Sequence, residues 1–187
     1  AYTCRRLVPS DGVVADIGGN IGTTTLPFAA AVPRGRVHVF EPSVAMRRCL
    51  ERNLELSRLA NVRVHAFGLS DAPSRGRLVV AVEGNPGSAF FVAASAESRG
   101  ETLAEPADDG IDVRRLDDVL ADEARLDFVK IDVEGHELHV LRGAAALLQR
   151  HRPSVLLEIN EGALQRAGTS GREVCRHLLS LGYRLYF

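Results

Sequence analysis

The chain has 187 residues, of which 45% are hydrophobic and 25% are charged, and its formal net charge is −1. This length and composition fit one globular domain over residues 1–187 with a sizeable core. A charge so close to neutral gives no global attraction to nucleic acid or to an anionic membrane, and no apolar run is long enough to span a bilayer. Three widely separated cysteines argue against a disulfide framework and favour a cytoplasmic location.

Short apolar runs alternate with helix-compatible segments along most of the chain. The strands expected are Val13–Ile17, Arg36–Phe40, Val62–Ala66, Asp127–Val133, Val155–Ile159 and Tyr183–Phe187, and the helices lie near residues 23–31, 43–57, 136–150 and 171–181. Nearly continuous apolar strands that alternate with helices indicate a parallel sheet covered on both faces. We therefore predict an α/β fold, with Ser43 capping the second helix.

Residues 76–113 interrupt this alternation. Arg77–Val82 and Ala89–Ala94 have the pattern of short strands joined by a turn-rich link, and residues 95–110 are polar. We predict an inserted antiparallel hairpin followed by a mobile loop. Insertions of this kind often carry substrate contacts, and a solvated loop without a role is an equally good interpretation.

A glycine-rich loop follows the first expected strand. Asp16 lies near the end of that strand, and glycines follow at Gly18, Gly19 and Gly22. Glycine lets the backbone turn sharply and approach a ligand closely. The spacing is G-G-x-x-G rather than the dinucleotide pattern G-x-G-x-x-G, and an acid beside the loop would repel a pyrophosphate. An acid there suits a ligand with an ammonium or sulfonium group, whereas glycines that only serve packing are the alternative.

Glu41 directly follows the second expected strand. A carboxylate at this position can accept hydrogen bonds from both ribose hydroxyls. Together with the acid and the glycines before it, this favours an adenosine-containing cofactor that carries a positive charge. S-adenosylmethionine has an ammonium, a sulfonium and a ribose. Ser70 and Asp71 follow the third strand and could contact the adenine amino group, or form a turn before Pro73.

A dense polar cluster follows the fourth expected strand. Asp132, Glu134 and His136 lie there, and Glu158 and Asn160 end the next strand. His136 or Glu134 could act as a general base that removes a hydroxyl proton. Alternatively, the oxygens of Asp132, Glu134, Glu158 and Asn160 could bind Mg²⁺. These residues could also only cap a helix and fix loops. Lys130, inside the apolar strand, is interpreted as one half of a structural ion pair.

Five blocks of sequence resemble the FkbM family of S-adenosylmethionine-dependent methyltransferases, in the order that the family has them. They are D-I-G-G-N-I-G at 16–22, E-P-S at 41–43, L-D-D-V-L at 116–120, K-I-D-V-E-G-H-E at 130–137 and L-E-I at 157–159. The resemblance implies a class I methyltransferase fold, which is Rossmann-like, with strand order 3-2-1-4-5-7-6. It also implies O-methylation of a hydroxyl on a sugar or a secondary metabolite such as a polyketide.

The resemblance also assigns residues to roles. Asp16, Gly18, Asn20 and Gly22 correspond to the methionine end of the cofactor, Glu41 to the ribose, Ser43 and Asp71 to the adenine side, and Asp132 and Glu134 to the transferred methyl. The predicted cofactor-binding set is therefore Asp16, Gly18, Gly19, Asn20, Gly22, Glu41, Ser43, Ser70, Asp71 and Asp132, and the predicted catalytic set is Asp132, Glu134 and His136. The chain ends where this fold normally adds a hairpin and a final antiparallel strand, so we expect an open sheet edge that favours a homodimer.

We predict an O-methyltransferase that uses S-adenosylmethionine, with Mg²⁺ as a second ligand if the acid cluster binds a metal. Its expected partner is a small hydroxylated acceptor, with no role for nucleic acid or a membrane. The alternative is a non-catalytic or N-methylating cofactor-binding domain within a larger biosynthetic protein. Amino methylases of nucleic acids usually carry an N-P-P-Y-like motif where this chain has residues 132–135, D-V-E-G. The glycine spacing argues against a nicotinamide dehydrogenase.

Overall fold

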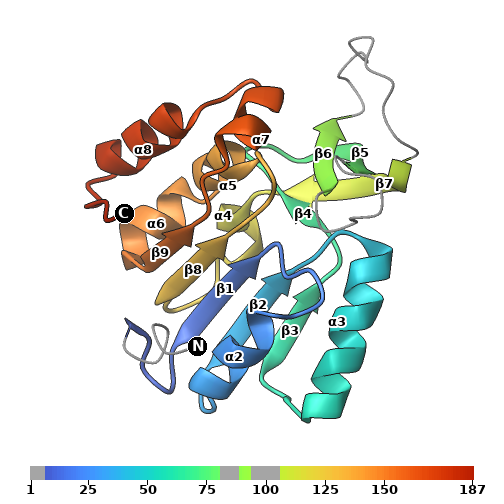
Figure 1. Cartoon of the computed structure of the whole chain (residues 1–187). Helices are drawn as coiled ribbons and strands as arrows, with labels where there is room; N and C mark the ends of the chain where they lie inside the picture. Colours follow the sequence, from blue (N-terminus) through green and yellow to red (C-terminus); the bar gives the residue numbers. More distant parts are fainter. Residues whose placement is uncertain (1–6, 81–88, 94–105) are drawn as a thin grey trace.

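The computed structural model describes residues 7–80, 89–93 and 106–187 (Figure 1). Five parallel strands form the main sheet in the order β3-β2-β1-β8-β9. Their bounds are Val62–His65 for β3, Arg36–Phe40 for β2, Val13–Ile17 for β1, Phe128–Ile131 for β8 and Ser154–Leu157 for β9. Counted along the chain within this sheet, the order is 3-2-1-4-5, which confirms that part of the expected fold. The direction of winding reverses between β1 and β8, where open α/β sheets bind ligands.

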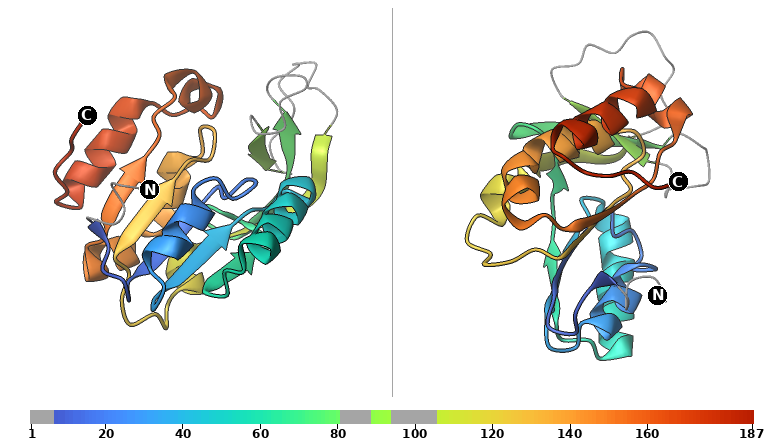
Figure 2. Two further views of the ribbon diagram at one scale, coloured as in Figure 1. Left: turned by 60° about the horizontal axis from the view of Figure 1, so that its bottom comes forward. Right: turned by 90° about the vertical axis from the view of Figure 1, so that its left-hand side faces the viewer.

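Helices cover both faces of the main sheet, as predicted (Figure 2). On one face, Val14, Val37 and Phe128 pack with Phe28 of α2 (Thr25–Ala31), while Val39 packs with Leu50 of α3 (Val44–Ser57). On the other face, Ala15, Ile17, Val129 and Ile131 pack against apolar residues of α4 (Leu116–Val119), α5 (Glu137–Gly143), α6 (Ala145–His151), α7 (Glu161–Arg166) and α8 (Gly171–Ser180). Burial on both faces of β1, β2 and β8 explains why these three strands are almost continuously apolar.

Two helix predictions have different outcomes. Ser43 caps α3 as predicted, because its hydroxyl oxygen accepts a hydrogen bond from the backbone N–H of Met46 at 3.4 Å. The single helix expected over residues 136–150 is instead divided into α5 and α6 at Ala144. Gly143 lies against the backbone of Ser70 so closely that a Cβ atom would meet its carbonyl oxygen at 1.9 Å. This close contact requires glycine at position 143. Glycine is a poor helix former, and α5 ends at this residue.

A second, four-stranded sheet lies beside the carboxyl ends of the main strands (Figure 1). Its order is β4-β7-β5-β6, from Gly68–Leu69, Pro106–Arg114, Ser74–Val80 and Ala89–Ala93. The antiparallel pairing of β5 with β6 confirms the predicted hairpin. The mobile-loop prediction is wrong for residues 106–110, which begin β7 and pair with β5. Burial of Ile111 and Val113 against Leu78 anchors β7 despite the polar residues before it. Residues 81–88 and 94–105 of the predicted hairpin and loop lie outside the described part.

The expected sixth strand over Tyr183–Phe187 is also wrong, because these residues are irregular. Tyr183 is held individually: its hydroxyl donates a hydrogen bond to the carbonyl oxygen of Leu148 at 3.3 Å, and the guanidinium carbon of Arg152 lies 4.6 Å from the ring centroid. Tyr186 and Phe187 are exposed. Tyr183 is therefore attached to α6 and the residue that follows it rather than to a strand partner. Within the described residues, no helix is both long and apolar enough to cross a membrane.

Candidate active site

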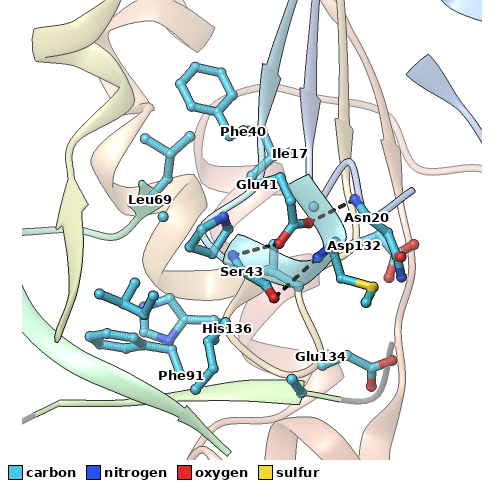
Figure 3. Close-up of a pocket in the computed structure, with 18 of the residues that line it drawn as sticks. Ile17, Asn20, Phe40, Glu41, Ser43, Leu69, Phe91, Asp132, Glu134 and His136 are labelled. Atoms are coloured by element: carbon cyan, nitrogen blue, oxygen red, sulfur yellow. Dashed lines mark hydrogen bonds between the residues drawn. The ribbon is translucent and has the colours of Figure 1, made fainter. Parts of the chain in front are cut away.

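A cavity of about 240 Å³ lies at the carboxyl ends of β1, β2 and β8, at the point where the winding reverses. Polar groups of the main sheet and its loops line one part, among them Asn20, Glu41, Lys130, Asp132 and Glu134. Apolar residues of the second sheet line another part (Figure 3). A concave apolar site with a few convergent polar groups has the character of a small-molecule site.

Glu41 is fixed at the end of β2 by the backbone on either side of it. One carboxylate oxygen accepts a hydrogen bond from the N–H of Asn20 at 2.7 Å, and the other accepts one from the N–H of Ser43 at 2.8 Å (Figure 3). Burial raises the pKa of Glu41, while these two hydrogen bonds work in the opposite direction. Each carboxylate oxygen can accept a further bond, so Glu41 is positioned to receive a pair of hydroxyl donors.

The glycine loop is clamped between β2 and β8. The N–H groups of Gly18 and Gly19 both donate to the carbonyl oxygen of Phe40, at 3.0 and 3.1 Å. Gly18 has φ +80°, and a Cβ atom there would lie 1.9 Å from the carbonyl oxygen of Asp132. Only glycine fits such a conformation at such a close approach. At Gly19 and Gly22 a Cβ atom would instead meet the side chains of Val39, Leu26 and Leu50, and Gly22 also has a left-handed backbone with φ +97°.

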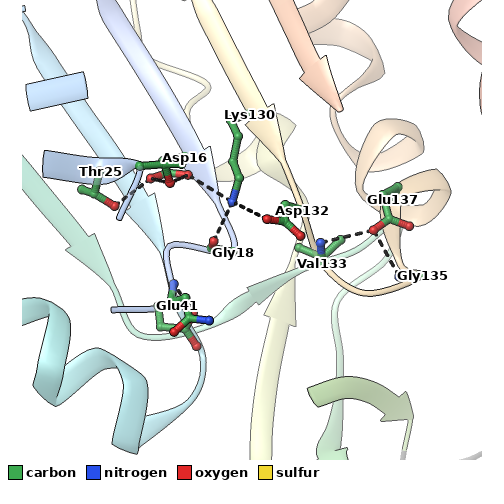
Figure 4. Close-up of polar contacts among 11 residues, drawn as sticks. Asp16, Gly18, Thr25, Glu41, Lys130, Asp132, Val133, Gly135 and Glu137 are labelled. Carbon is green, nitrogen blue, oxygen red and sulfur yellow. Dashed lines mark hydrogen bonds and ion pairs between the residues drawn. The ribbon is translucent and has the colours of Figure 1, made fainter. Parts of the chain in front are cut away.

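Lys130 joins the acids that surround the loop (Figure 4). Its ammonium donates to the carbonyl oxygen of Gly18 at 2.8 Å and lies 3.2 Å from the carboxylate of Asp132 and 3.6 Å from that of Asp16. Asp16 is completely buried and also accepts a 2.7 Å hydrogen bond from the Thr25 hydroxyl. Burial raises the pKa of Asp16, and Lys130 opposes this shift. The predicted ion pair of Lys130 is confirmed, and it ties β8 to the glycine loop.

The turn after β8 is strained and acidic. Glu134 has φ 51°, which is uncommon for a residue other than glycine, and Gly135 follows with φ 103°. The buried carboxylate of Glu137 holds this turn by accepting bonds from the N–H groups of Val133 and Gly135. Burial, followed by the charge of Asp132, raises the pKa of Glu134. Backbone strain held in place by such bonds is typical of functional sites.

Glu158 adds another acidic side chain close to Asp132 and Glu134. The pKa of Glu158, which follows β9, is raised mainly by the charge of Asp132. Glu158, Asp132 and Glu134 all line the cavity. Among the described residues of the lining, Lys130 is the only cation. His136 also lines the cavity, but its lowered pKa keeps it neutral at physiological pH. This part of the cavity therefore favours a positively charged ligand.

His136 stands at the N-terminus of α5 in a defined tautomer. Its Nε2 atom lies 2.9 Å from the Ser70 hydroxyl oxygen, and that hydroxyl donates to the carboxylate of Asp71 at 3.2 Å. Since a carboxylate only accepts, the Ser70 oxygen must accept the Nε2 proton of His136. The Nδ1 atom makes no hydrogen bond with a described residue. It is therefore the free acceptor of this side chain.

The surroundings of His136 keep it neutral. Its ring stacks on that of His139 with centroids 4.5 Å apart, and His139 in turn contacts Asp71 at 3.2 Å. Burial, followed by the neighbouring His139, lowers the pKa of His136 to about 4. Burial works to raise the pKa of Asp71, but its bonds with His139 and Ser70 hold it below its usual value. The result is an uncharged imidazole facing the cavity beside a charged acid that lies behind it.

The sequence that builds this site matches a known domain family. A profile of the methyltransferase FkbM domain matches residues 16–185. The chain belongs to the FkbM family. This FkbM domain is 30% identical over 148 residues to Methyltransferase 1 of Beauveria bassiana, with 72% of this chain and 59% of that protein covered. It is 32% identical over 201 aligned residues to the antimetabolite synthetase AmbE of Pseudomonas aeruginosa, with 89% of this chain and 9% of AmbE covered.

A solved structure shares the fold. The methyltransferase FkbM of Methylobacillus flagellatus superimposes with a TM-score of 0.62 at 21% identity, over 92% of this chain and 38% of that one. The family and the fold of this FkbM domain, an α/β class I methyltransferase fold, are therefore established. The chain spans less than two thirds of the length of each of these proteins.

The structure brings together part of the predicted cofactor-binding set. The members that line the cavity are Gly18, Asn20, Glu41, Ser43 and Asp132. Outside its lining lie Asp16, Gly19, Gly22, Ser70 and Asp71. The side chains of Ser70 and Asp71 contact histidines instead, so their place on the adenine side stays a prediction. All three predicted catalytic residues, Asp132, Glu134 and His136, line the cavity.

The structure does not support the Mg²⁺ interpretation. No group of three or more His, Cys, Asp or Glu side chains within the described residues is arranged to hold a metal ion. The side-chain oxygen of Asn160 accepts a bond from the N–H of Ala163 and so caps α7. Asp132 is already paired with Lys130. At least two of the four residues proposed from the sequence, Asp132 and Asn160, therefore make other contacts.

Sequence reasoning missed the apolar side of the cavity. Leu69, Leu78, Phe91, Ile111 and Val113 line it, from all four strands of the second sheet. The only signal was the apolar character of residues 78–80 and 89–93. Which side chains face the cavity depends on the pairing of β5 with β7, and the sequence did not reveal β7 in full.

Proposed function

We propose that this domain binds S-adenosylmethionine and transfers its methyl group to a hydroxyl of a small molecule. The observation that carries the proposal is Glu41, whose carboxylate is fixed by two backbone N–H groups beside the glycine loop of a methyltransferase-family domain. Two carboxylate oxygens at the end of β2 match the two hydroxyls of a ribose. The Glu41 carboxylate would hold the ribose, and Gly18 and Asn20 would face the amino-acid end.

The electrostatics of the cavity support this orientation. Bound S-adenosylmethionine supplies an electrophilic methyl group on a positively charged sulfur. Asp132, Glu134 and Glu158 surround the part of the cavity next to the glycine loop. Their field attracts a cation and binds a neutral product less strongly. Lys130 offsets part of this charge and keeps the loop in place.

His136 is the residue best placed to take the hydroxyl proton. Its Nδ1 lone pair is free, and Ser70 and Asp71 hold the tautomer that keeps it free. As the acceptor oxygen bonds to the methyl carbon, its proton passes to Nδ1. Ser70 is in this account a positioning residue, because it acts through His136. Alignment of the acceptor oxygen with the methyl group supplies the larger part of the rate.

A methyl-transfer assay tests this proposal. The protein is incubated with S-adenosylmethionine carrying a labelled methyl group and with panels of hydroxyl and amine compounds of matched carbon skeleton. We expect the label in the hydroxyl compounds as an ether. Label in the amine compounds alone would contradict O-methylation.

A second candidate is a cofactor-binding domain within a larger biosynthetic protein, either N-methylating or without transfer activity. The observation in its favour is that the region matching AmbE makes up 9% of that synthetase. Tight binding of S-adenosylhomocysteine without transfer to either panel would support the non-catalytic form. Transfer restricted to amines would support the N-methylating form.

A further inference from the structure

Within the described part of the chain, every side chain that the second sheet adds to the cavity is apolar. Those described are Leu69, Leu78, Ala89, Phe91, Ile111 and Val113, which we call the apolar wall. Leu78, Ile111 and Val113 are buried as one cluster, and Ala89 and Phe91 pack against it. The wall therefore forms a defined surface rather than a set of scattered apolar residues. Cofactor binding at Glu41 and the glycine loop does not account for it.

His136 lies at the junction between the wall and the acidic part of the cavity. The ring of Phe91 approaches the imidazole edge-on, with centroids 5.4 Å apart and an interplanar angle of 66° (Figure 3). Asp132 and Glu134, on the other side of the junction, come from the turn after β8. A molecule lying on the wall would place a hydroxyl at its edge next to the imidazole and toward the acids.

We propose that the apolar wall is the acceptor subsite and that it takes an aromatic compound with a phenolic hydroxyl. This inference rests on the proposed function of the same cavity. An aromatic ring would be removed from water by the wall and would find an aromatic neighbour in Phe91. A sugar ring carries hydroxyls around its whole edge, and the described side chains of the wall offer them no hydrogen-bond partner, which makes burial of such a ring costly.

The chemistry at His136 agrees with this class of acceptor. The oxygen of the hydroxyl forms a bond to the methyl carbon, the carbon–sulfur bond breaks with its electron pair left on sulfur, and the proton goes to Nδ1. An imidazole whose pKa lies near 4 is a weak base. Proton transfer to a weak base is easier from a phenol than from an aliphatic alcohol, because the phenol is the stronger acid.

The adenine base of the cofactor is the competing occupant of the wall. Its amino group needs a hydrogen-bond acceptor, and the described wall residues provide none with their side chains. The two occupants make different predictions for variants of Phe91. An acceptor subsite would lose affinity for the acceptor alone, whereas an adenine site would lose affinity for the cofactor.

Calorimetric titration with 2-naphthol as the probe tests the proposal, in the presence and absence of saturating S-adenosylhomocysteine. Methyl glucoside is the polar comparison. Phe91→Ala removes the ring from the wall, and Phe90→Ala is the matched control. Phe90 neighbours it on β6, but its ring lies 5.8 Å from the guanidinium carbon of Arg166 and it is not part of the cavity lining. Phe91→Leu keeps apolar volume at the position, and thermal unfolding checks that each variant folds.

We expect 2-naphthol to bind and methyl glucoside not to bind. Phe91→Ala should weaken naphthol binding about tenfold through lost apolar contact, with Phe91→Leu in between and Phe90→Ala unchanged. Affinity for S-adenosylhomocysteine should stay the same in all three variants. Unchanged naphthol binding in Phe91→Ala would overturn the proposal. So would binding of methyl glucoside in preference to naphthol, or an equal loss of S-adenosylhomocysteine affinity.

The same titrations separate this inference from the proposed function. If the unaltered protein fails to bind S-adenosylhomocysteine, yet binds 2-naphthol in a manner that depends on Phe91, the cofactor proposal fails and the subsite stands. If it binds S-adenosylhomocysteine and not 2-naphthol, the subsite fails and the cofactor proposal stands.

Discussion

The backbone N–H of Asn20 donates a 2.7 Å hydrogen bond to the carboxylate of Glu41, which lies 21 residues further along the chain. This bond joins the loop after β1 to the end of β2. The glycine loop and the acid are therefore one unit, in which the same carboxylate fixes the loop and faces the cavity. A substitution at Glu41 should change both.

We expect Glu41→Gln to weaken binding of S-adenosylhomocysteine about 100-fold, because charged hydrogen bonds of this kind are each worth about 1.5–3 kcal/mol. The amide NH₂ group would also face the backbone N–H of Asn20 or Ser43, which cannot accept a bond. Glu51→Gln is the control, because that side chain is half-exposed on α3. Calorimetry measures both variants. Equal affinities in the two would contradict the role of Glu41.

His136→Gln should lower kcat about 100-fold or more and leave S-adenosylhomocysteine affinity unchanged, since loss of a general base typically costs 10²–10⁴-fold. Ser70→Ala should lower kcat less, because it removes only the partner that fixes the tautomer. Steady-state kinetics with any accepted substrate measures both. A loss of cofactor binding in His136→Gln that equals its loss of kcat would show a structural role.

The pH profile provides an independent check on His136. Its pKa lies near 4, so the imidazole stays neutral and able to accept a proton as the pH falls from neutrality to about 5. Activity should therefore persist through the range in which an ordinary histidine becomes charged. His139→Gln should move the acid limb of kcat to higher pH, because His139 helps to lower the pKa of His136. An acid limb near the ordinary histidine value in the unaltered protein would argue against His136 as the base.

Lys130→Met should lower the free energy of unfolding by about 3–5 kcal/mol, because it leaves a completely buried carboxylate, that of Asp16, without its cation. The double variant Lys130→Met, Asp16→Asn should recover part of this loss by removing the orphaned charge. Urea unfolding measures both. If the two variants were equally destabilised, the ion pair would not be the cause.

A buried pair of histidines away from the cavity predicts acid sensitivity. His38 Nδ1 lies 3.1 Å from His65 Nε2, and His38 Nε2 lies 3.0 Å from the carboxylate of Glu123. The Glu123 carboxylate accepts a hydrogen bond from the Nε2–H of His38, so Nδ1 of His38 is an acceptor and the Nε2–H of His65 donates to it. Burial, followed by the charges of His38 and nearby arginines, lowers the pKa of His65 to about 4. Burial lowers that of His38 too.

Below the ordinary histidine pKa, the unfolded chain binds protons that the folded chain does not, so stability falls as the pH decreases toward 4. We expect the unaltered protein to lose about 2 kcal/mol of unfolding free energy between roughly pH 7.5 and 4.5 through this pair. His65→Phe, which keeps a ring to stack on Phe40, should lose clearly less over the same range. Urea unfolding at the two pH values measures this. An identical pH dependence in both proteins would contradict the assignment.

The parallel sheet was predictable from the sequence, with its strands placed to within about two residues at each end, because their signals are local. β1, β2 and β8 are buried on both faces, so each reads as an apolar run, and an acid lies at or near the end of each run. The order of these runs along the chain is therefore enough to place Glu41, Asp132 and His136 at one edge of the sheet.

The remaining features depend on contacts between distant segments. Asp16 was expected to face the ligand, whereas its carboxylate accepts a hydrogen bond from Thr25 and pairs with the ammonium of Lys130. Tyr183 was expected in a strand, but its aromatic side chain packs on α6 and Arg152 instead. The polar start of β7 forms a strand only because β5 supplies its partner. A single sequence shows the residue types in each case but not the partner.

The most direct test of the central claim is calorimetric titration of the protein with S-adenosylmethionine, S-adenosylhomocysteine and NAD. The account predicts binding of the two adenosyl ligands and none of NAD, because the Glu41 carboxylate fits a ribose while the acids beside the glycine loop repel a pyrophosphate. Binding of NAD, or binding of none of the three ligands, would contradict it.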